Sequence, residues 1–294
     1  MNINNPLSHR NKEPERSVLY IVGTPIGNLD DISIRAINIL KNVSLIACED
    51  TRKTGRLLKH LDISNKLISF NEYNSLRKLD FLIKMLEEGK SLAVVSDAGM
   101  PLISDPGESI VNKAKKNNFD VICIPGPCAA ITALVSSGID ATKFTFYGFL
   151  PKKSLDRELM LKEIYENNKT SIVYESPKRI KKLLNDLKNL CGEERKLVLL
   201  KELTKRYEKH FGDNIKKVLE KMEFSDPKGE YTLIISGTQK HRNEDFISNK
   251  NLIIDLKELI KAGLSNSSAA NYLANKSGVP KNEIYKLSIK NNLE

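Results

Sequence analysis

The feature that most constrains the fold of this chain is a short apolar run followed at once by a turn of small residues. In the clearest case, the run Leu92–Val95 is followed by Asp97, Ala98 and Gly99. Such a run predicts a buried strand. Because ligands of open α/β sheets bind at the carboxyl ends of the strands, this turn sets a carboxylate and a bare backbone where a ligand would bind. The alternative is a capped turn between a strand and a helix, without a ligand.

The residues that follow this turn predict the start of a helix. Asp105 suits the N-cap, Pro106 the first helical position and Glu108 the third. The apolar residues 100–103 lie between the turn and this helix, which favours a ligand that is partly apolar and partly hydrogen-bonding.

Two more predicted strands, 17–22 and 119–124, end in comparable turns that contain Gly23 and Gly126. The first turn lacks both the glycine spacing of a dinucleotide fingerprint and the lysine of a Walker loop, so NAD and ATP are disfavoured as ligands. Three such turns at one edge of a sheet indicate a pocket more strongly than any one of them. We therefore expect Gly23, Gly99 and Gly126 to border a shared hollow.

Strands and helices alternate from residue 17 to residue 142, which predicts an α/β fold with a parallel, doubly wound sheet and right-handed crossovers. The expected parts are a disordered leader (1–16), an N-terminal α/β domain (17–142), a second α/β domain (143–240) and a linker with a small helical segment (241–294). The end of this last part resembles a helix-turn-helix layout, so the segment is RNA-binding-like. A nucleic-acid role and a purely structural appendage both fit its pattern.

Positive charge is concentrated in the second half of the chain. The net charge is +10, with 18 basic and 16 acidic residues up to residue 150 and 29 and 21 after it. This asymmetry favours a polyanion partner, nucleic acid rather than membrane. The alternative is ordinary solubility charge on solvated helix faces.

Cysteine and histidine usage favours a cytoplasmic protein without a metal. The four cysteines show no CxxC spacing, which indicates reduced thiols, and no two of the four histidines have metal-ligand spacing on a helix. No apolar run approaches membrane-spanning length, and the polar first sixteen residues lack the apolar region of a signal peptide.

A charged group ends the predicted strand 43–47. Asp50 is a good N-cap for the next helix, but capping explains neither Glu49 nor Arg52, which makes them candidate site residues. In the second domain, Lys201 and Glu202 stand at the end of the predicted strand 196–200.

Four stretches together resemble the tetrapyrrole-methylase superfamily: VGTPIGNLDDISIRAINIL, ACEDTRKTGRLL, VSDAGMPLISDPGE and IPGPCAAITALVSSG. Within this superfamily, the chain resembles the branch of bacterial small-subunit ribosomal RNA cytidine-2′-O-methyltransferases. The run from Glu49 to Arg52 and the SDAGMPLISDPG form are specific to that branch. The resemblance covers residues 17–240, and the terminal helical segment is similar to that branch too.

This resemblance implies S-adenosylmethionine bound between the two α/β domains of a homodimer. The positions that match the family's cofactor-binding motifs are Thr24, Pro25, Ile26, Asp97, Gly99, Met100, Ile103, Cys128, Ala129, Tyr174 and Leu203. Cys128 departs from the small hydroxyl residue common at that turn in relatives.

The activity that the resemblance implies is methylation of a cytidine 2′-hydroxyl in ribosomal RNA, free or in the small ribosomal subunit. As hypotheses, the base that activates the hydroxyl is Glu49, Asp50 or Glu202, and Arg52 and Lys201 orient ribose or phosphate. No metal is required. A tetrapyrrole methylase and a non-catalytic RNA-binding assembly factor remain alternatives.

Overall fold

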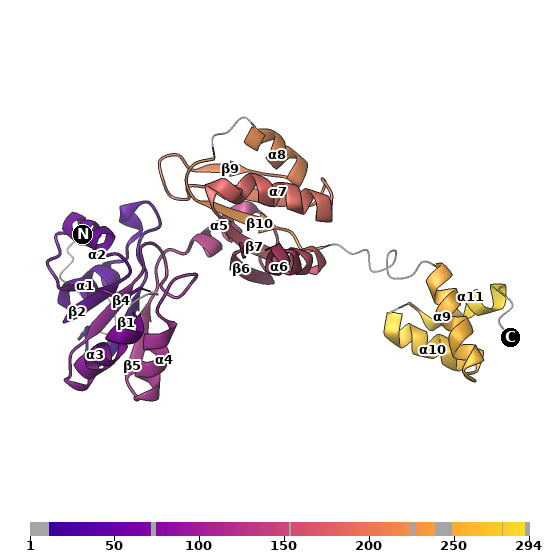
Figure 1. Ribbon diagram of the computed structural model, residues 1–294, viewed down its shortest axis with the longest axis horizontal. Helices are drawn as coiled ribbons and strands as arrows, with labels where there is room; N and C mark the ends of the chain where they lie inside the picture. The colour runs from indigo at the N-terminus through magenta and orange to yellow at the C-terminus, as the bar shows by residue number, and fades with distance from the viewer. Residues whose placement is uncertain are drawn as a thin grey trace. The chain divides into compact units, whose positions relative to one another are not determined.

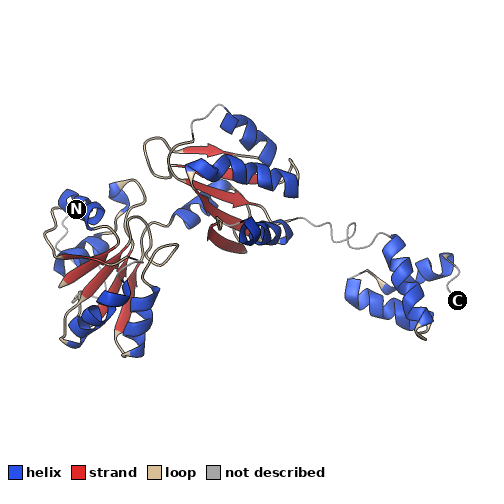
Figure 2. Cartoon of the chain, in the orientation of Figure 1, coloured by secondary structure: helices blue, strands red, loops and turns tan. Residues whose placement is uncertain are grey.

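The structure is a computed structural model of the chain, and it describes residues 12–71, 75–152, 154–223, 227–238, 249–277 and 279–291. The chain divides into two compact units, residues 1–236 and 237–294. Among the described residues, the first unit contains two five-stranded sheets with helices packed on them (Figures 1 and 2). No helix in the described ranges is long and apolar enough to cross a membrane.

The first sheet is parallel, with the strand order β3-β2-β4-β1-β5, so the predicted parallel sheet is confirmed. Its strands are β1 (Val18–Val22), β2 (Leu45–Cys48), β3 (Leu67–Ser69), β4 (Leu92–Val95) and β5 (Asp120–Ile124). Every residue of β1, β2 and β4 is buried. These strands lie inside the sheet with helices over both faces, which is why they consist of continuous apolar runs.

Helices cover both faces of this sheet. They are α1 (Ile34–Asn42), α2 (Thr51–His60), α3 (Ser75–Glu87) and α4 (Glu108–Lys116). Ile39 of α1 and Leu58 of α2 belong to one core cluster, and Leu82 of α3 and Ile110 of α4 belong to another. The chain therefore winds α1 and α2 over one face and α3 and α4 over the other, as a doubly wound fold requires.

The helix start expected at Asp105 is wrong. Helix α4 begins at Glu108, and Gly107 at its N-cap gives no side-chain hydrogen bond. The physical reason lies just upstream, where Leu102 and Ser104 have φ values of +73° and +63°. These left-handed residues fold the chain back into a loop before the helix begins, so Asp105 takes no part in capping.

The second sheet is mixed, with the order β6-β7-β10-β8-β9. Its strands are β6 (Phe144–Phe149), β7 (Thr170–Glu175), β8 (Leu197–Lys201), β9 (Lys209–Phe211) and β10 (Tyr231–Ile235). β6 and β7 are parallel, and the other pairs are antiparallel. One face is covered by α6 (Ser154–Glu166), α7 (Pro177–Cys191) and α8 (Ile215–Glu223).

Helix α5 (Ala129–Ser137) follows β5 of the first sheet but packs on the second sheet. Its residues Ala130 and Ala133 are buried against Ile172 of β7, Leu200 of β8 and Ile234 of β10. The small alanine side chains let the helix approach the sheet closely. Helix α5 therefore leads directly from the strand-end turn of β5 to the second sheet (Figure 1).

Among its described residues, the second unit contains three helices. They are α9 (Asn249–Lys261), α10 (Asn266–Ser277) and α11 (Lys281–Lys290), which pack around Leu256, Leu273 and Ile284. At the start of the chain, the expected leader lies partly outside the described residues, which begin at Lys12. The Glu13 side chain accepts two hydrogen bonds from Arg35 of α1, at 2.6 and 2.7 Å.

Candidate active site

The small-residue turns of the first sheet meet at one place, as predicted. Of the three glycines expected to border a hollow there, Gly99 lines the cavity described below, whereas Gly23 and Gly126 pack against each other. Thr24 and Gly99 exchange two backbone hydrogen bonds of 2.9 and 3.1 Å, which join the turns after β1 and β4. A Cβ atom added to Gly126 would lie 2.8 Å from Cα of Gly23, so the turns after β1 and β5 touch through their backbones. Glycine is required at this contact because any side chain would push the two turns apart.

A cavity of about 410 Å³ lies between these turns and the second sheet. Its volume falls within the range of roughly 300–1,000 Å³ typical of small-molecule sites. Most of the predicted cofactor residues line it, namely Ile26, Asp97, Gly99, Met100, Ile103, Cys128, Ala129 and Tyr174. We call this space the donor cavity.

The remaining predicted cofactor residues lie behind the lining of the donor cavity. Thr24 is 2% exposed and its backbone holds Gly99, while Pro25 is buried beside it. Leu203 packs in one cluster with Ile26. These residues shape the donor cavity through the groups that they support.

One wall of the donor cavity is aromatic. The Tyr174 ring packs edge-on against Phe146 and Phe149, with ring centroids 5.0 and 5.5 Å apart. Burial raises the pKa of the Tyr174 phenol above its ordinary value, so this side chain stays neutral. Next to it, the buried Glu175 carboxylate is paired with Arg179 at 2.7 Å and Arg157 at 3.5 Å.

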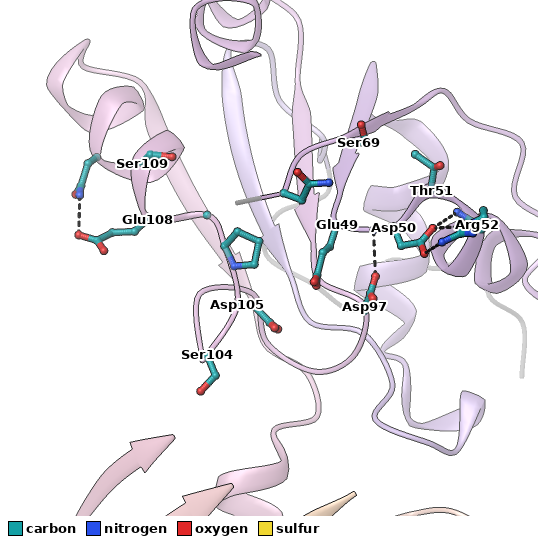
Figure 3. Close-up of a pocket in the computed structure, with 14 residues that line it drawn as sticks. Glu49, Asp50, Thr51, Arg52, Ser69, Asp97, Ser104, Asp105, Glu108 and Ser109 are labelled. Atoms are coloured by element: carbon teal, nitrogen blue, oxygen red, sulfur yellow. Dashed lines mark hydrogen bonds and ion pairs between the residues drawn. The ribbon is translucent and has the colours of Figure 1, made fainter. Parts of the chain in front are cut away.

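A second cavity, of about 1160 Å³, has a strongly polar lining, and we call it the acceptor cavity. It is lined by Glu49, Asp50, Thr51, Arg52, Ser69, Asn71, Asp97, Ser104, Asp105, Pro106, Gly107, Glu108, Ser109 and Asn112 (Figure 3). Glu49, Asp97, Ser104 and Asp105 also line the donor cavity, so the two spaces adjoin at these four residues.

Two of the carboxylates at this site are held by cations and backbone amides. Asp97 accepts hydrogen bonds from Lys53 Nζ at 2.6 Å and from the Asp50 backbone amide at 3.1 Å. Asp50 caps α2 as predicted, and it also accepts hydrogen bonds from the Arg52 side chain at 2.7 and 3.0 Å. These bonds from Arg52 hold the pKa of Asp50 well below its usual range.

The carboxyl groups of Glu49 and Asp105 have raised pKa values. Burial raises the pKa of Glu49, and the negative charge of Asp97 raises it further. Burial also raises the pKa of Asp105 to about 6, with Glu49 and Asp97 adding to the shift. In Figure 3 the Glu49 and Asp105 side chains extend into the same region of the cavity, in agreement with this coupling.

Lys201 and Glu202 lie outside the linings of both cavities. Lys201 Nζ lies 5.6 Å from the centroid of the Tyr231 ring. The Glu202 carboxylate accepts hydrogen bonds from Lys205 Nζ at 3.0 Å and from the Glu230 backbone amide at 2.9 Å. The structure therefore brings Glu49, Asp50 and Arg52 together but leaves these two residues apart from them.

Several lining residues were missed from the sequence. Asp105 and Ser104 were read as part of a helix start, and only their backbone conformation places them at the cavities. Glu175 stands at the end of β7 between Tyr174 and the Ser-Pro helix start, a position that could have indicated a site residue. In the described part of the chain, no group of three or more histidine, cysteine, aspartate or glutamate residues is arranged to hold a metal ion.

Comparison with known proteins identifies the family. Residues 18–219 match the family model of tetrapyrrole (corrin/porphyrin) methylases. The chain belongs to this family. Ribosomal RNA small subunit methyltransferase I of Haemophilus influenzae is 42% identical over 92% of this chain and 96% of its own length. The Synechocystis protein of the same name is 40% identical over 92% of this chain and 97% of its own length.

Solved structures of tetrapyrrole methylases share the fold. Uroporphyrin-III-C-methyltransferase from Thermus thermophilus aligns with a TM-score of 0.55 and 17% identity, over 75% of this chain and 94% of that one. A cobalt-precorrin-4 methyltransferase of cobalamin biosynthesis aligns with a TM-score of 0.57 and 16% identity, over 75% and 95%. At this level of identity, the likeness concerns the fold.

Membership of the family makes the chain a methyltransferase whose methyl donor is S-adenosylmethionine. The residues of the donor cavity fit this molecule. Met100, Ile103 and the neutral Tyr174 offer apolar contacts, while the Asp97 carboxylate offers a hydrogen-bond acceptor. The tight backbone contact at Gly126 forms a cradle that a single Cβ atom would disrupt.

Proposed function

We propose that this chain methylates the 2′-hydroxyl of a cytidine in small-subunit ribosomal RNA. The observation that carries the proposal is the identity of about 40% with ribosomal RNA small subunit methyltransferase I proteins over more than nine-tenths of both chains. The adjoining donor and acceptor cavities support it, because methyl transfer requires two reactants side by side.

S-Adenosylmethionine supplies an electrophilic methyl group whose positive charge disappears on transfer. In this proposal the residues of the donor cavity hold it, with Met100, Ile103 and Tyr174 as apolar contacts. The acceptor cavity holds the ribose so that its oxygen lies about 3 Å from the methyl carbon, a near-attack arrangement.

The candidate catalytic residues have different roles in this proposal, according to where each one lies. Glu49 borders both cavities, and Arg52, whose side chain is 87% exposed, lies where it can contact ribose or phosphate of bound RNA. Asp50 orients Arg52 and caps α2. We place Lys201 on the RNA-facing rim of the second sheet, while Glu202 positions Lys205 through their ion pair.

RNA binding extends to the second unit in this proposal. Exposed lysines there include Lys257, Lys261, Lys276, Lys281, Lys286 and Lys290. The exposed rings of Tyr272 and Tyr285 offer surfaces on which bases stack. Binding to RNA is then expected to weaken steeply with salt.

We also propose that the chain forms a homodimer in the cytoplasm. Val135 of α5 is 73% exposed, and Leu155 and Leu159 of α6 are 69% and 61% exposed. Large exposed apolar side chains of this kind support a protein–protein interface. Light scattering of the purified protein tests this part, and a monomer at micromolar concentration contradicts it.

The main experiment is transfer of a labelled methyl group by the purified protein. Small ribosomal subunits and protein-free small-subunit RNA, both from a strain that lacks the chain, serve as substrates, and mass spectrometry locates the modified ribose. We expect label on one cytidine 2′-oxygen. Label in a porphyrin fraction instead would identify a tetrapyrrole methylase. Calorimetry that detects no binding of S-adenosylmethionine would favour a non-catalytic assembly factor.

A further inference from the structure

Three carboxyl groups stand where the donor and acceptor cavities meet, those of Glu49, Asp97 and Asp105. A methyl group that passes from one cavity to the other must pass these residues. We propose that the Asp105 carboxylate takes the proton of the methyl-accepting hydroxyl, and that Glu49 is a positioning residue that acts through Asp105. This inference rests on the proposed function, because it assigns a role within that reaction.

The neighbouring carboxylates of Asp97 and Asp50 are already paired with other groups. Asp97 accepts hydrogen bonds from Lys53 Nζ and from the Asp50 amide, and Asp50 is held by the Arg52 side chain. Both carboxylates already hold a cation, and protonation of either one would break these ion pairs and hydrogen bonds. These two groups therefore organise the junction rather than accept the proton.

The backbone shows that Asp105 is held at the junction at a cost. Leu102 and Ser104 adopt positive φ values, a strained backbone conformation that tends to occur at functional sites. Neighbouring glycines accommodate the loop: an added Cβ at Gly148 would lie 2.9 Å from Ser104 Oγ, and one at Gly107 would lie 2.8 Å from Leu102 Cδ1. The start of α4 thereby loses the side-chain cap that Asp105 would have provided.

Titratable groups from four parts of the chain face Asp105. Glu49 at the end of β2 and Asp97 after β4 raise its pKa, and Lys53 of α2 lowers it. Tyr174 of β7 faces it as a neutral phenol whose own pKa the Asp105 charge raises. A hydrogen bond with Ser96 also favours the Asp105 carboxylate. The outcome is a carboxyl group that is mostly ionised near neutral pH yet basic enough to receive a proton.

The proposed step balances in atoms and electrons. The hydroxyl oxygen forms a bond to the methyl carbon, the bond from that carbon to sulfur breaks, and its electron pair stays on sulfur. The hydroxyl proton moves to Asp105 Oδ as the bond forms. The acceptor cavity, which Asp105 also lines, then lets water remove this proton and restore the carboxylate.

The test compares Asp105→Asn with the wild type and with Asp120→Asn, a control at an exposed residue at the start of β5, the opposite end of that strand from the turn. Three quantities are measured: the binding of S-adenosylmethionine by calorimetry, the single-turnover methylation rate against pH, and the ¹³C shift of the Asp105 carboxyl group against pH. We expect Asp105→Asn to bind the donor but to methylate at least about 100-fold more slowly, within the range of general-base effects. Asp120→Asn should match the wild type.

The pH dependence separates Asp105 from Glu49. In the wild type, the rate should rise with pH as the Asp105 carboxyl resonance titrates near pH 6. Glu49→Gln should move that titration to lower pH, because it removes a neighbouring negative charge. Two results would overturn the inference. One is a methylation rate for Asp105→Asn within threefold of the wild-type rate. The other is a rise of the rate with pH that persists in Asp105→Asn and disappears in Glu49→Gln. A wild-type protein that binds the donor but methylates no RNA would instead overturn the proposed function.

Discussion

The donor cavity and the acceptor cavity share Glu49, Asp97, Ser104 and Asp105, but the donor cavity has a large apolar part in its lining that the acceptor cavity lacks. Around the donor cavity, Met100, Ile103, Phe149 and Tyr174 supply apolar surface. Around the acceptor cavity, side chains are mainly carboxylates and hydroxyls, and Arg52 is the basic residue among them.

This difference indicates how the two reactants are separated. A sulfonium compound with an apolar body suits the donor cavity. The carboxylate-rich acceptor cavity suits hydroxyl and amino groups, which donate hydrogen bonds, and it repels phosphate. We therefore expect the nucleoside of the acceptor to enter the cavity while its phosphates lie outside, near Arg52 and the basic surface of the chain.

The largest expected effect comes from a substitution that forces apart the backbone contact between Gly23 and Gly126, which supports the donor cavity. In Gly126→Ala, the new Cβ would lie within 3.0 Å of three backbone atoms of Gly23, and backbone does not yield cheaply. Overpacking of this kind costs about 1–3 kcal/mol, so the affinity for S-adenosylmethionine should fall by up to about 100-fold. Calorimetry measures this loss directly.

The matched control for Gly126→Ala is Gly55→Ala in α2. There the new Cβ meets its nearest neighbour, Leu67 Cδ1, at 3.9 Å, an ordinary contact. Because alanine favours a helix over glycine by up to about 1 kcal/mol, this variant should be as stable as the wild type or more so. Equal donor affinity in both variants would show that the turns do not shape the donor cavity.

The next effect concerns the aromatic wall of the donor cavity. Tyr174→Ala removes a ring that lines the donor cavity, so donor affinity should fall about 10-fold, the equivalent of losing roughly 1.4 kcal/mol of apolar contact with the donor. Tyr174→Phe keeps the ring and should lose at most about threefold in affinity by the same reasoning. A loss as large for phenylalanine as for alanine would transfer the role from the ring to the hydroxyl group.

Much of the donor side could be predicted from the sequence. Apolar runs that end at Gly23, Gly99 and Gly126 specify both the parallel strands and the positions where backbone must meet backbone, because glycine tolerates such contacts. Asp50 was recognised as a cap because helix starts follow local rules.

Other residues of the acceptor cavity could not be predicted in the same way, because backbone conformations that local sequence rules do not describe place them there. Asp105, Pro106 and Glu108 satisfy every rule for a helix start, yet the left-handed Leu102 and Ser104 shift the start and turn Asp105 toward the cavities. Similarly, no local rule specifies that α5, which follows a strand of the first sheet, packs on the second sheet. Strand β9 has three residues and no alternating pattern, so it was missed.

The raised pKa of Asp105, at the junction between the cavities, predicts a loss of folding stability that depends on pH. Asp105 loses its proton at an ordinary pKa of 3.8 in the unfolded chain but at about 6 in the folded protein. Between these values the folded state binds more protons, so its free energy of unfolding falls as pH rises, and the full cost is present above pH 6. Allowing for solvent screening of this partly exposed group, the cost is about 1–2 kcal/mol.

Asp105→Asn should remove this cost. Urea unfolding at pH 7.5 should show the variant to be about 1–2 kcal/mol more stable than the wild type, with little gain at pH 3.5, where the wild-type carboxyl is mostly protonated in both states. Asp120→Asn, at an exposed residue, controls for the amide itself. A gain that is the same at both pH values would mean that the buried carboxylate is not its cause.

The smallest expected effect lies at the outer edge of the acceptor cavity. Arg52 is 87% exposed, so Arg52→Gln should leave the donor affinity unchanged and raise the KM for RNA only a few-fold. If Arg52 contacts a phosphate that stays outside the carboxylate-rich space, the slope of log affinity against log salt should also decrease by about 1. Lys115→Gln, on an exposed residue near the end of α4, provides the charge-matched control. A large fall in kcat for Arg52→Gln with an unchanged salt slope would place Arg52 at the reacting ribose, and phosphate exclusion would then no longer explain the acidic lining.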